Sequence, residues 1–401
     1  MGAGVIGTEF LKGQGLGNQL FSYVTARCIA LERGCAFGTA GQEQLAVNIH
    51  SKKGMYFMDM DLGERIETGT KDGLAPAAEY GTGTAAADGS GACAARSSGV
   101  RKEELRRYDE KELRFFQGTS VHDMEHGCYV AGEDGALHSL PDNTLIYGNM
   151  QDERYFARYR EQIREWLRVR PEYDTHEFTR DNLCILNLRG GEYTGHPELY
   201  LSRGYWLKGM KNMRKIRPDM EFIIVTDDPE AAHKLLPGLP VYHSDLDRDY
   251  VMLKNARYLL LSNSSFAFFP AYTSTTLQAA IAPKYWARHN VSDGYWASEQ
   301  NIYSIFQYQD RSGRLFTPEE CRQELEAYKK TSGKYKNAGK RPEGMKAAWC
   351  RLESRVRYGM FYLRKIWYSL TRRAGWKVPY GQNVGWRGTR FLKDKEKGVK
   401  E

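Results

Sequence analysis

The sequence lacks any apolar run that approaches the roughly 18 residues of a membrane span, so it predicts no transmembrane helix. Its N-terminus lacks the charged start, apolar centre and small-residue cleavage site of a secretory signal. The seven cysteines are odd in number and form no CxxC pair, which argues against a disulfide framework and against a zinc site. From these absences we expect a cytoplasmic protein.

Acidic residues are scarce only near the C-terminus. From Lys334 onward the chain has 19 Lys and Arg against 5 Asp and Glu, whereas the preceding residues have 39 against 45. The overall formal charge of +8 therefore hides a mildly acidic body and a cationic tail. A nucleic-acid-binding protein would be expected to carry a basic face on its folded body, so we expect no nucleic-acid partner.

Two glycine patterns occur near the N-terminus, and only one has the context of a phosphate-binding turn. The GxGxxG pattern that begins at Gly2 has no strand before it. The GQGLGN pattern, residues 13–18, follows a predicted strand over 5–11 and leads into a helix predicted over 18–32. That order of strand, turn and helix places backbone amides against a phosphate. The residues expected to bind phosphate here are Gly15, Gly17 and Asn18. An NAD-dependent oxidoreductase that uses the first pattern is an alternative.

Three apolar segments in the second half of the chain end in polar residues. They are LCILNLRGGE at 183–192, FIIVTDD at 222–228 and YLLLSNSS at 258–265. Helices are predicted between them, over 205–216 and 229–236, and this alternation predicts a parallel sheet with helices on both faces. Ligands of such sheets bind past the carboxyl ends of the strands. The polar residues expected to converge there are Asn187, Arg189, Glu192, Asp227, Asp228, Asn263, Ser264 and Ser265.

At 401 residues the chain is long enough for two domains. The predicted units are an N-terminal domain at 1–165, a second domain at 166–310 and a helical extension at 311–401. A stretch rich in Gly, Ala, Ser and Thr at about 63–100 has hardly any large apolar side chain, so we expect a flexible insertion there. Further helices are predicted over 102–116 and 152–169, and a short strand over 144–148.

Four motifs follow one another in the order found in a known enzyme family. GQGLGNQLFSY at 13–23 is similar to a GGLGNQLFQY-type opening, and the later strand ends are similar to HxRRxD, FSDD-like and NSTFSWW motifs. GNMQDERYF at 148–156 is similar to the segment between that family's two domains. Over roughly residues 5–290 the chain therefore resembles the α-1,2-fucosyltransferases of glycosyltransferase family 11.

The resemblance implies a GT-B-like fold, in which two Rossmann-like domains face one another. The second domain would hold the sugar nucleotide and the first would hold the acceptor. It implies an inverting, metal-independent transfer of fucose from GDP-fucose to a glycan hydroxyl, in the synthesis of a surface polysaccharide or glycolipid. No cofactor besides the sugar nucleotide is then required.

The chain departs from the family pattern at three positions. Asn187 stands where the family has His, Gly190 where it has a second Arg, and Glu192 where it has Asp. These departures leave the identity of the donor open. They also keep a second alternative, a non-catalytic protein of the same fold that binds a glycan or a membrane.

Arg189 is the main candidate for catalysis, together with Glu192. A planar guanidinium makes charge-assisted bonds to a diphosphate and neutralises the leaving group where no metal does so. Arg189 could instead pair with Glu192 or Asp228 at a surface, but the two glycines beside it favour a ligand. Asp227 and Asp228 could touch substrate or cap the helix that follows. The general base stays open among His196, Glu192 and Glu198.

The C-terminal region predicts a basic amphipathic helix from about Met345. Its apolar residues recur at helical spacing and include Trp349, Leu352, Val356, Met360, Leu363 and Trp367. Such a helix can lie on an anionic membrane surface, which would make the protein peripheral to the inner face of the membrane. The alternative is a helix that packs back on the first domain with a solvated basic face.

Overall fold

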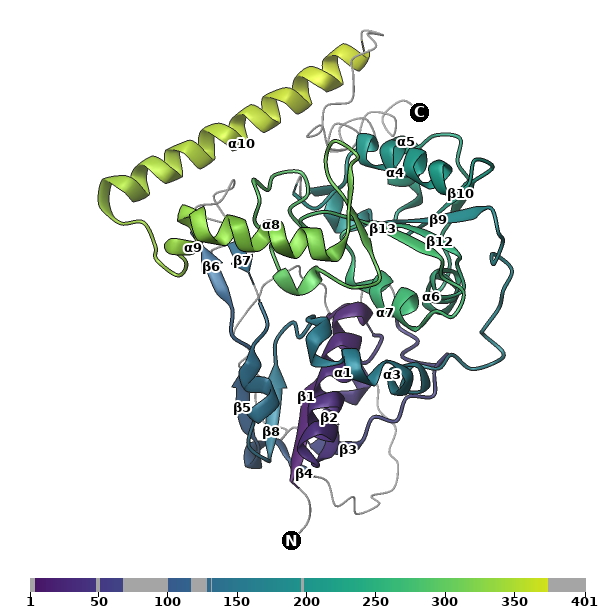
Figure 1. Ribbon diagram of the computed structural model, residues 1–401, viewed down its shortest axis with the longest axis vertical. Coiled ribbons are helices and arrows are strands. Elements are labelled where there is room, and N and C mark those ends of the chain that lie inside the picture. The colour runs from purple at the N-terminus through teal and green to yellow at the C-terminus, as the bar shows by residue number, and fades with distance from the viewer. Residues whose placement is uncertain are drawn as a thin grey trace, which may run out of the picture.

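The computed structural model describes residues 4–47, 51–67, 100–116, 128–130, 132–195 and 198–373. Two α/β units lie one below the other in Figure 1, the N-terminal unit in purple and blue and the next in teal and green. Each is built on a mainly parallel sheet. The expected α/β class, with two Rossmann-like domains in a GT-B-like arrangement, is confirmed.

The first sheet has the strand order β4-β3-β2-β1-β8-β5, and all of its paired strands are parallel. The strands are β1 (Val5–Glu9), β2 (Ala36–Ala40), β3 (Glu64–Glu67), β4 (Val100–Arg101), β5 (Arg106–Asp109) and β8 (Thr144–Tyr147). Helix α1 (Leu16–Arg33) connects β1 to β2. Gly7 lies inside β1, where a Cβ atom would come within 3.0 Å of the Gly38 carbonyl. The first glycine pattern therefore serves strand packing at this position.

The second sheet has the order β11-β10-β9-β12-β13-β14-β15, and only β15 is antiparallel to its neighbour. The strands are β9 (Leu183–Leu188), β10 (Glu221–Thr226), β11 (Val241–Tyr242), β12 (Tyr258–Leu261), β13 (Ala279–Pro283), β14 (Gln307–Gln309) and β15 (Leu315–Phe316). The helices between them are α4 (Arg203–Ile216), α5 (Pro229–Leu235), α6 (Leu246–Lys254) and α7 (Phe268–Thr273). After β9 the chain adds β10 and β11 on one side of it and then β12 to β15 on the other. The strand order therefore reverses between β9 and β12, and a ligand crevice is expected at their carboxyl ends.

Alternate residues of the central strands point to opposite faces of this sheet. Leu186 of β9 and Leu260 of β12 pack in a cluster with α4 and α5. Ile185 and Leu259 belong to the cluster that contains α6 and α7. Because both faces are covered, the strands have continuous apolar sequences.

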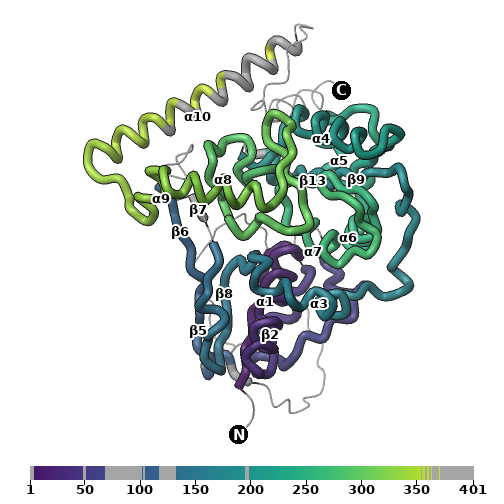
Figure 2. The backbone as a smooth tube through the Cα atoms, viewed as in Figure 1, coloured from purple at the N-terminus to yellow at the C-terminus, as the bar shows by residue number. Residues whose placement is uncertain are grey.

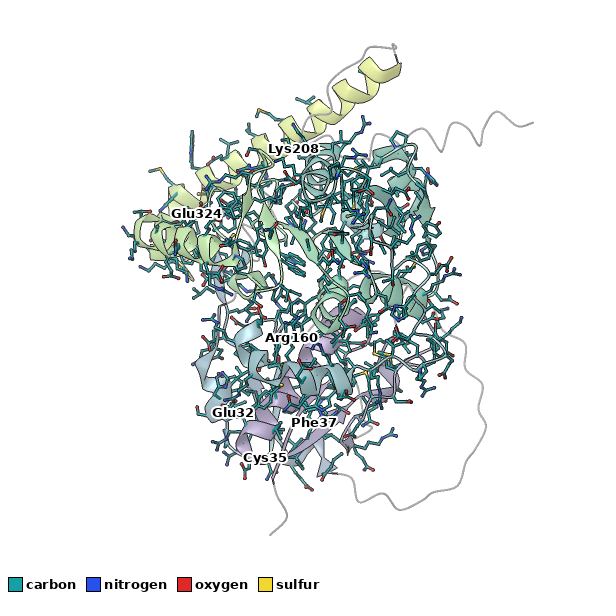
Figure 3. The ribbon with its side chains drawn as sticks, turned by 45° about the vertical axis from the view of Figure 1, so that its right-hand side comes forward. Glu32, Cys35, Phe37, Arg160, Lys208 and Glu324 are labelled. Atoms are coloured by element: carbon teal, nitrogen blue, oxygen red, sulfur yellow. The ribbon has the colours of Figure 1, made fainter. Side chains whose placement is uncertain are left out.

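The two domains share one core. The cluster that includes Ile6 of the first sheet also includes Leu259 of the second. Its centre is Phe21 of α1, whose ring centroid lies 4.8 Å from those of Phe268 and Phe269. Arg160, at the start of α3 (Arg160–Trp166), also crosses between the domains and donates to the Tyr272 carbonyl at 3.2 Å (Figure 3).

Several expectations for the first domain are wrong. The helix predicted over 102–116 is absent: a 3₁₀ turn at Lys102–Glu104 leads into β5 and β6 (Leu113–Phe115). The Lys, Glu and Arg residues there favour a helix locally, but pairing of β5 with β8 and of β6 with β7 (Cys128–Val130) overrides that preference. The helix predicted over 152–169 is much shorter in the structure, where only α3 is α-helical. Two 3₁₀ turns precede α3, and Asp152 caps the first of them by accepting the Arg154 N–H.

Two boundaries also differ from expectation. Residues 64–67 of the predicted insertion form β3, whereas residues 68–99 lie outside the described residues. The second sheet continues to Phe316, past the predicted domain end at 310, because β14 and β15 add to its edge. Helices α8 (Pro318–Thr331), α9 (Gly333–Lys336) and α10 (Gly344–Arg373) follow.

The shared core predicts that Phe21→Ala destabilises both domains together. We expect one unfolding transition, with a loss of about 3–5 kcal/mol in the free energy of unfolding, because the ring leaves a cavity where the domains meet. Urea unfolding followed by tryptophan fluorescence measures this. Leu31→Ala, on an exposed part of the same helix, is the matched control and should cost less than about 1 kcal/mol. Two separate transitions in Phe21→Ala would contradict a shared core.

Candidate active site

A pocket of about 240 Å³ lies where the N-terminus of α1 meets the carboxyl ends of β9 and β10. Nine of the eleven residues that we expected at the phosphate-binding turn and the strand ends line it, and Asp228 is one of the two that do not: the nine are Gly15, Gly17, Asn18, Asn187, Arg189, Glu192, Asp227, Ser264 and Ser265. They come from both domains, so the turn after β1 and the strand ends of the second sheet form one site. Asn263 does not line this pocket.

The first-domain wall is the start of α1. Gly15 precedes this 18-residue helix in an extended conformation, and no side chain caps it. The first turn contains no acidic residue, so the N-terminal amides and the positive end of the helix dipole face the pocket without a competing carboxylate on that turn. Asn18 is held in place by Gln151, whose Nε2 donates to its Oδ1 at 3.1 Å.

Gly17 permits close approach of the two domains. A Cβ atom at this position would lie within 3.0 Å of the Phe266 nitrogen and of the Ser265 carbonyl group. Any larger residue would therefore displace α1 from the segment that follows β12. This contact brings Ser264 and Ser265 to the same pocket as the helix start.

Arg189 is held at the pocket wall by two carboxylates. Its Nη1 lies 2.9 Å from Oδ2 of Asp227, and its Nη2 lies 2.7 Å from Oε1 of Glu192. Asp227 also accepts the Gly190 N–H at 2.7 Å through its other oxygen. The pairing of Arg189 with Glu192 that we considered from the sequence is present, and it occurs inside the pocket.

Asp228 caps α5. One of its oxygens accepts the Ala231 N–H at 3.0 Å, and the other accepts the Gly191 N–H at 3.2 Å. A Cβ atom on Gly190 would lie within 3.0 Å of the Asp228 side chain. The glycine that stands in place of the family's second arginine is therefore required by this packing.

Three predicted polar residues lie elsewhere or are not described. The Asn263 amide donates to the Leu199 carbonyl at 2.6 Å and accepts the Ala287 N–H at 2.8 Å, which ties it to the backbone. Glu198 does not line the pocket, and His196 lies outside the described residues. Among the three candidate bases, Glu192 is the one that lines the pocket.

Asp249 on α6 lines the pocket and was not predicted. Burial raises the pKa of Asp249 to about 8, and the charges of Asp227 and Asp247 add to this rise. The Ser244 N–H, at 3.2 Å from its Oδ1, opposes it. A sequence signal was present. Asp249 follows Leu246 by three residues, in a helical stripe whose other members, Tyr250 and Leu253, are apolar.

His243 was also missed. Its Nδ1 lies 2.9 Å from the Thr226 carbonyl oxygen, so Nδ1 carries the proton and donates it. His243 lines the pocket beside Asp249. Within the residues that the structure describes, no group of three or more His, Cys, Asp or Glu is placed to hold a metal ion.

Comparison with known proteins gives distant relatives. No protein-family profile matches the chain. The chain is similar to an alpha-1,2-colitosyltransferase of Escherichia coli, with 23% identity over 167 residues, which is 37% of this chain and 58% of that protein. The chain thus matches little more than half the length of this curated relative. By this comparison the chain is similar to a glycosyltransferase.

Among solved structures, the chain is similar to the NodZ alpha-1,6-fucosyltransferase soaked with GDP-fucose. The TM-score is 0.34 with 11% sequence identity, and the alignment covers 68% of this chain and 93% of the other. The fold itself is established by the two sheets.

The raised pKa of Asp249 predicts a pH-dependent stability. Its folded-state pKa of about 8 exceeds its ordinary value of 3.8, so stability is fully present below about pH 4 and is lost as the pH rises to about 8. Asp249→Asn removes this loss. We expect the variant to be more stable than wild type by roughly 2–5 kcal/mol at pH 9 and similar to it at pH 4.

Urea unfolding across this pH range measures the difference. The matched control is Asp219→Asn, which removes a carboxylate from an exposed turn and should follow the wild-type profile. Parallel profiles for wild type and Asp249→Asn would show that Asp249 ionises normally in the folded protein.

Proposed function

We propose that the protein is an inverting glycosyltransferase of family 11 that transfers a sugar from a nucleoside diphosphate to a glycan hydroxyl. The proposed donor is GDP-fucose, the compound named for the NodZ structure, and the proposed acceptor belongs to a surface polysaccharide or glycolipid. The E. coli relative is named for transfer of colitose, so the transferred sugar could be colitose or a similar sugar in place of fucose. The observation that carries the proposal is the convergence of Arg189, the start of α1 and two serines on one pocket.

The pocket supplies cationic and neutral donors for a diphosphate. The α1 amides and helix dipole approach from one side, and the Arg189 guanidinium approaches from the other. The hydroxyls of Ser264 and Ser265 add neutral donors. These groups stabilise the negative charge that develops on the leaving diphosphate when its bond to the sugar breaks.

The two carboxylates on Arg189 have different roles in this proposal. Asp227 also binds the Gly190 amide, so it belongs to the framework of the loop. Glu192 is about half exposed, and one of its oxygens accepts a hydrogen bond from the Arg189 guanidinium. A bound diphosphate competes for that guanidinium, and Glu192 then turns toward the acceptor hydroxyl. There it accepts the proton as the acceptor oxygen attacks the anomeric carbon and the diphosphate leaves with the bonding electrons.

Asp249 supports guanine as the base of the donor. Asp249 is partly buried, and the Ser244 N–H donates to its Oδ1. Further N–H donors from a ligand would offset the desolvation that raises its pKa. Guanine presents two adjacent N–H donors, at N1 and N2, that match a carboxylate, and uracil and cytosine do not present this pair. Phe266 lies at the same wall and provides apolar surface for a base. The base would then sit between α6 and the end of β12.

The packing of Gly190 bears on the non-catalytic alternative. That alternative rested on the departures from the family motif, of which the missing arginine was the largest. Since the Asp228 side chain occupies the space that a side chain at 190 would need, this departure has a packing cause. It therefore gives no independent support to a loss of catalysis.

Nucleotide binding tests the proposal directly. Calorimetry without added metal should show binding of GDP and GDP-fucose in preference to UDP and CDP. Arg189→Ala should weaken GDP binding by about 10- to 150-fold, the effect of losing charge-assisted hydrogen bonds worth about 1.5–3 kcal/mol. Arg180→Ala, which removes an exposed arginine paired with Glu221, is the matched control and should leave the affinity unchanged. Equal GDP affinity in wild type and Arg189→Ala would overturn the assignment of the site.

The role of Glu192 predicts opposite effects on binding and turnover. Glu192→Gln removes the carboxylate that competes with the diphosphate, so GDP should bind several-fold more tightly. It also removes the base, so the rate of GDP release from GDP-fucose should fall by about a hundredfold or more. Calorimetry gives the affinity, and chromatography of the nucleotide gives the rate. Unchanged turnover in Glu192→Gln would assign the base to another group.

A further inference from the structure

Helix α10 (Gly344–Arg373) carries a long apolar stripe that the rest of the described chain leaves uncovered. It runs along the outside of the second domain in Figures 1 and 2. Its large apolar side chains at three- and four-residue spacing are 48% to 91% exposed: Met345, Trp349, Leu352, Val356, Met360 and Leu363. Leu370 continues the series with 54% exposure. An exposed stripe of this length marks an interaction surface.

These exposures contradict the alternative that the stripe packs back on the first domain. The base of the helix is nevertheless fixed to the body. Tyr335 of α9 packs edge-on against Phe115 at 5.0 Å, and the Gly339 N–H donates to the Arg114 carbonyl at 2.8 Å. Among the described residues, no helix combines the length and the hydropathy that a membrane crossing requires.

The net positive charge of α10 favours an anionic partner. The helix sequence contains eight basic residues, Lys346, Arg351, Arg355, Arg357, Arg364, Lys365, Arg372 and Arg373, and one acidic residue, Glu353. A second copy of α10 would bring a like charge against each of these cations. An anionic lipid surface provides the opposite charge over the whole length of the helix, and each nearby cation contributes about 1 kcal/mol there.

The spacing of the stripe also disfavours self-association. Trp349, Val356 and Leu363 recur every seven residues, as one core position of a coiled coil would. The other core position contains Met345 and Leu352 but then Gly359, which would leave a hole in the seam. A bilayer surface needs no such complementary packing, and exposed tryptophan is favoured at its interface.

We propose that α10 binds in the plane of an anionic phospholipid surface, with its apolar stripe inserted among the lipids and its cations at the headgroups. The base of α10 continues into α9 and α8, and α8 is seated in the core through Cys321 and Leu325. Glu324 of α8 also pairs with the buried Lys284 of β13's end (Figure 3). Through α9 and α8, a membrane-bound α10 would therefore be attached to the second domain. This inference is independent of the proposed enzymatic activity.

Co-sedimentation of the full chain with vesicles tests the proposal. We expect binding to vesicles of phosphatidylcholine mixed with phosphatidylglycerol, weaker binding to phosphatidylcholine alone, and loss of the difference at high salt. Arg351→Gln with Arg355→Gln should weaken binding to the anionic vesicles about 25-fold, since each cation is worth about fivefold. Leu352→Gln with Val356→Gln should weaken it at least tenfold through loss of inserted apolar area.

The matched control is Arg65→Gln with Arg168→Gln, which makes the same change in net charge at two exposed positions away from α10, one in β3 and one just after α3. It should bind vesicles within twofold of wild type, and the thermal unfolding of all variants should be the same because the changed side chains are exposed. Binding that ignores lipid charge, or that is equal in the α10 variants, would overturn the proposal. A dimer seen by light scattering without lipid, and lost in Leu352→Gln with Val356→Gln, would assign the stripe to a second copy instead.

Discussion

The packing of α1 against the segment after β12 is the contact on which the site depends. Phe21 stacks on Phe268 and packs at a tilt against Phe269, and this aromatic packing joins the first domain to the second. One turn earlier, Gly17 lets the backbone of the helix approach Ser265 directly. The same helix therefore supplies both the hydrophobic contact that joins the domains and the amides that face the pocket. Neither domain forms the pocket alone, because its walls come from both.

The electrostatics of the pocket combine two kinds of positive charge with three carboxyl groups. The helix dipole of α1 is a fixed partial charge that needs no movement. The Arg189 charge is instead shared with Asp227 and Glu192, which keeps the partly buried guanidinium paired. Asp249 adds a carboxyl group whose pKa burial raises to about 8. In the proposed donor complex, exchange of a carboxylate for a phosphate at Arg189 would change the partner of the guanidinium without leaving it unpaired.

The sequence was sufficient for those features whose signals are local. Apolar runs ending at Arg189, Asp227 and Ser264 predicted parallel strands that deliver polar residues to one edge, and the structure places these residues in one pocket. The residues at 102–116 were misassigned because their strands are stabilised by partners distant in the sequence. His243 could not be found because its place in the pocket depends on its bond to Thr226 of another strand. Gly190 looked like a lost functional residue until the position of Asp228 showed the lack of space beside it.

The shared core also limits how a ligand can enter. In a protein of two separately packed domains, a cleft can open by rotation about a hinge, at little cost in buried area. Here Phe21 and Phe156 of the first domain pack against Phe268 of the second, and rotation of one domain would expose these rings to water. Close packing at Gly17 resists the same movement. For the proposed donor complex we therefore expect rearrangement of side chains at the pocket mouth, above all of Glu192, which is half exposed and paired with the Arg189 guanidinium.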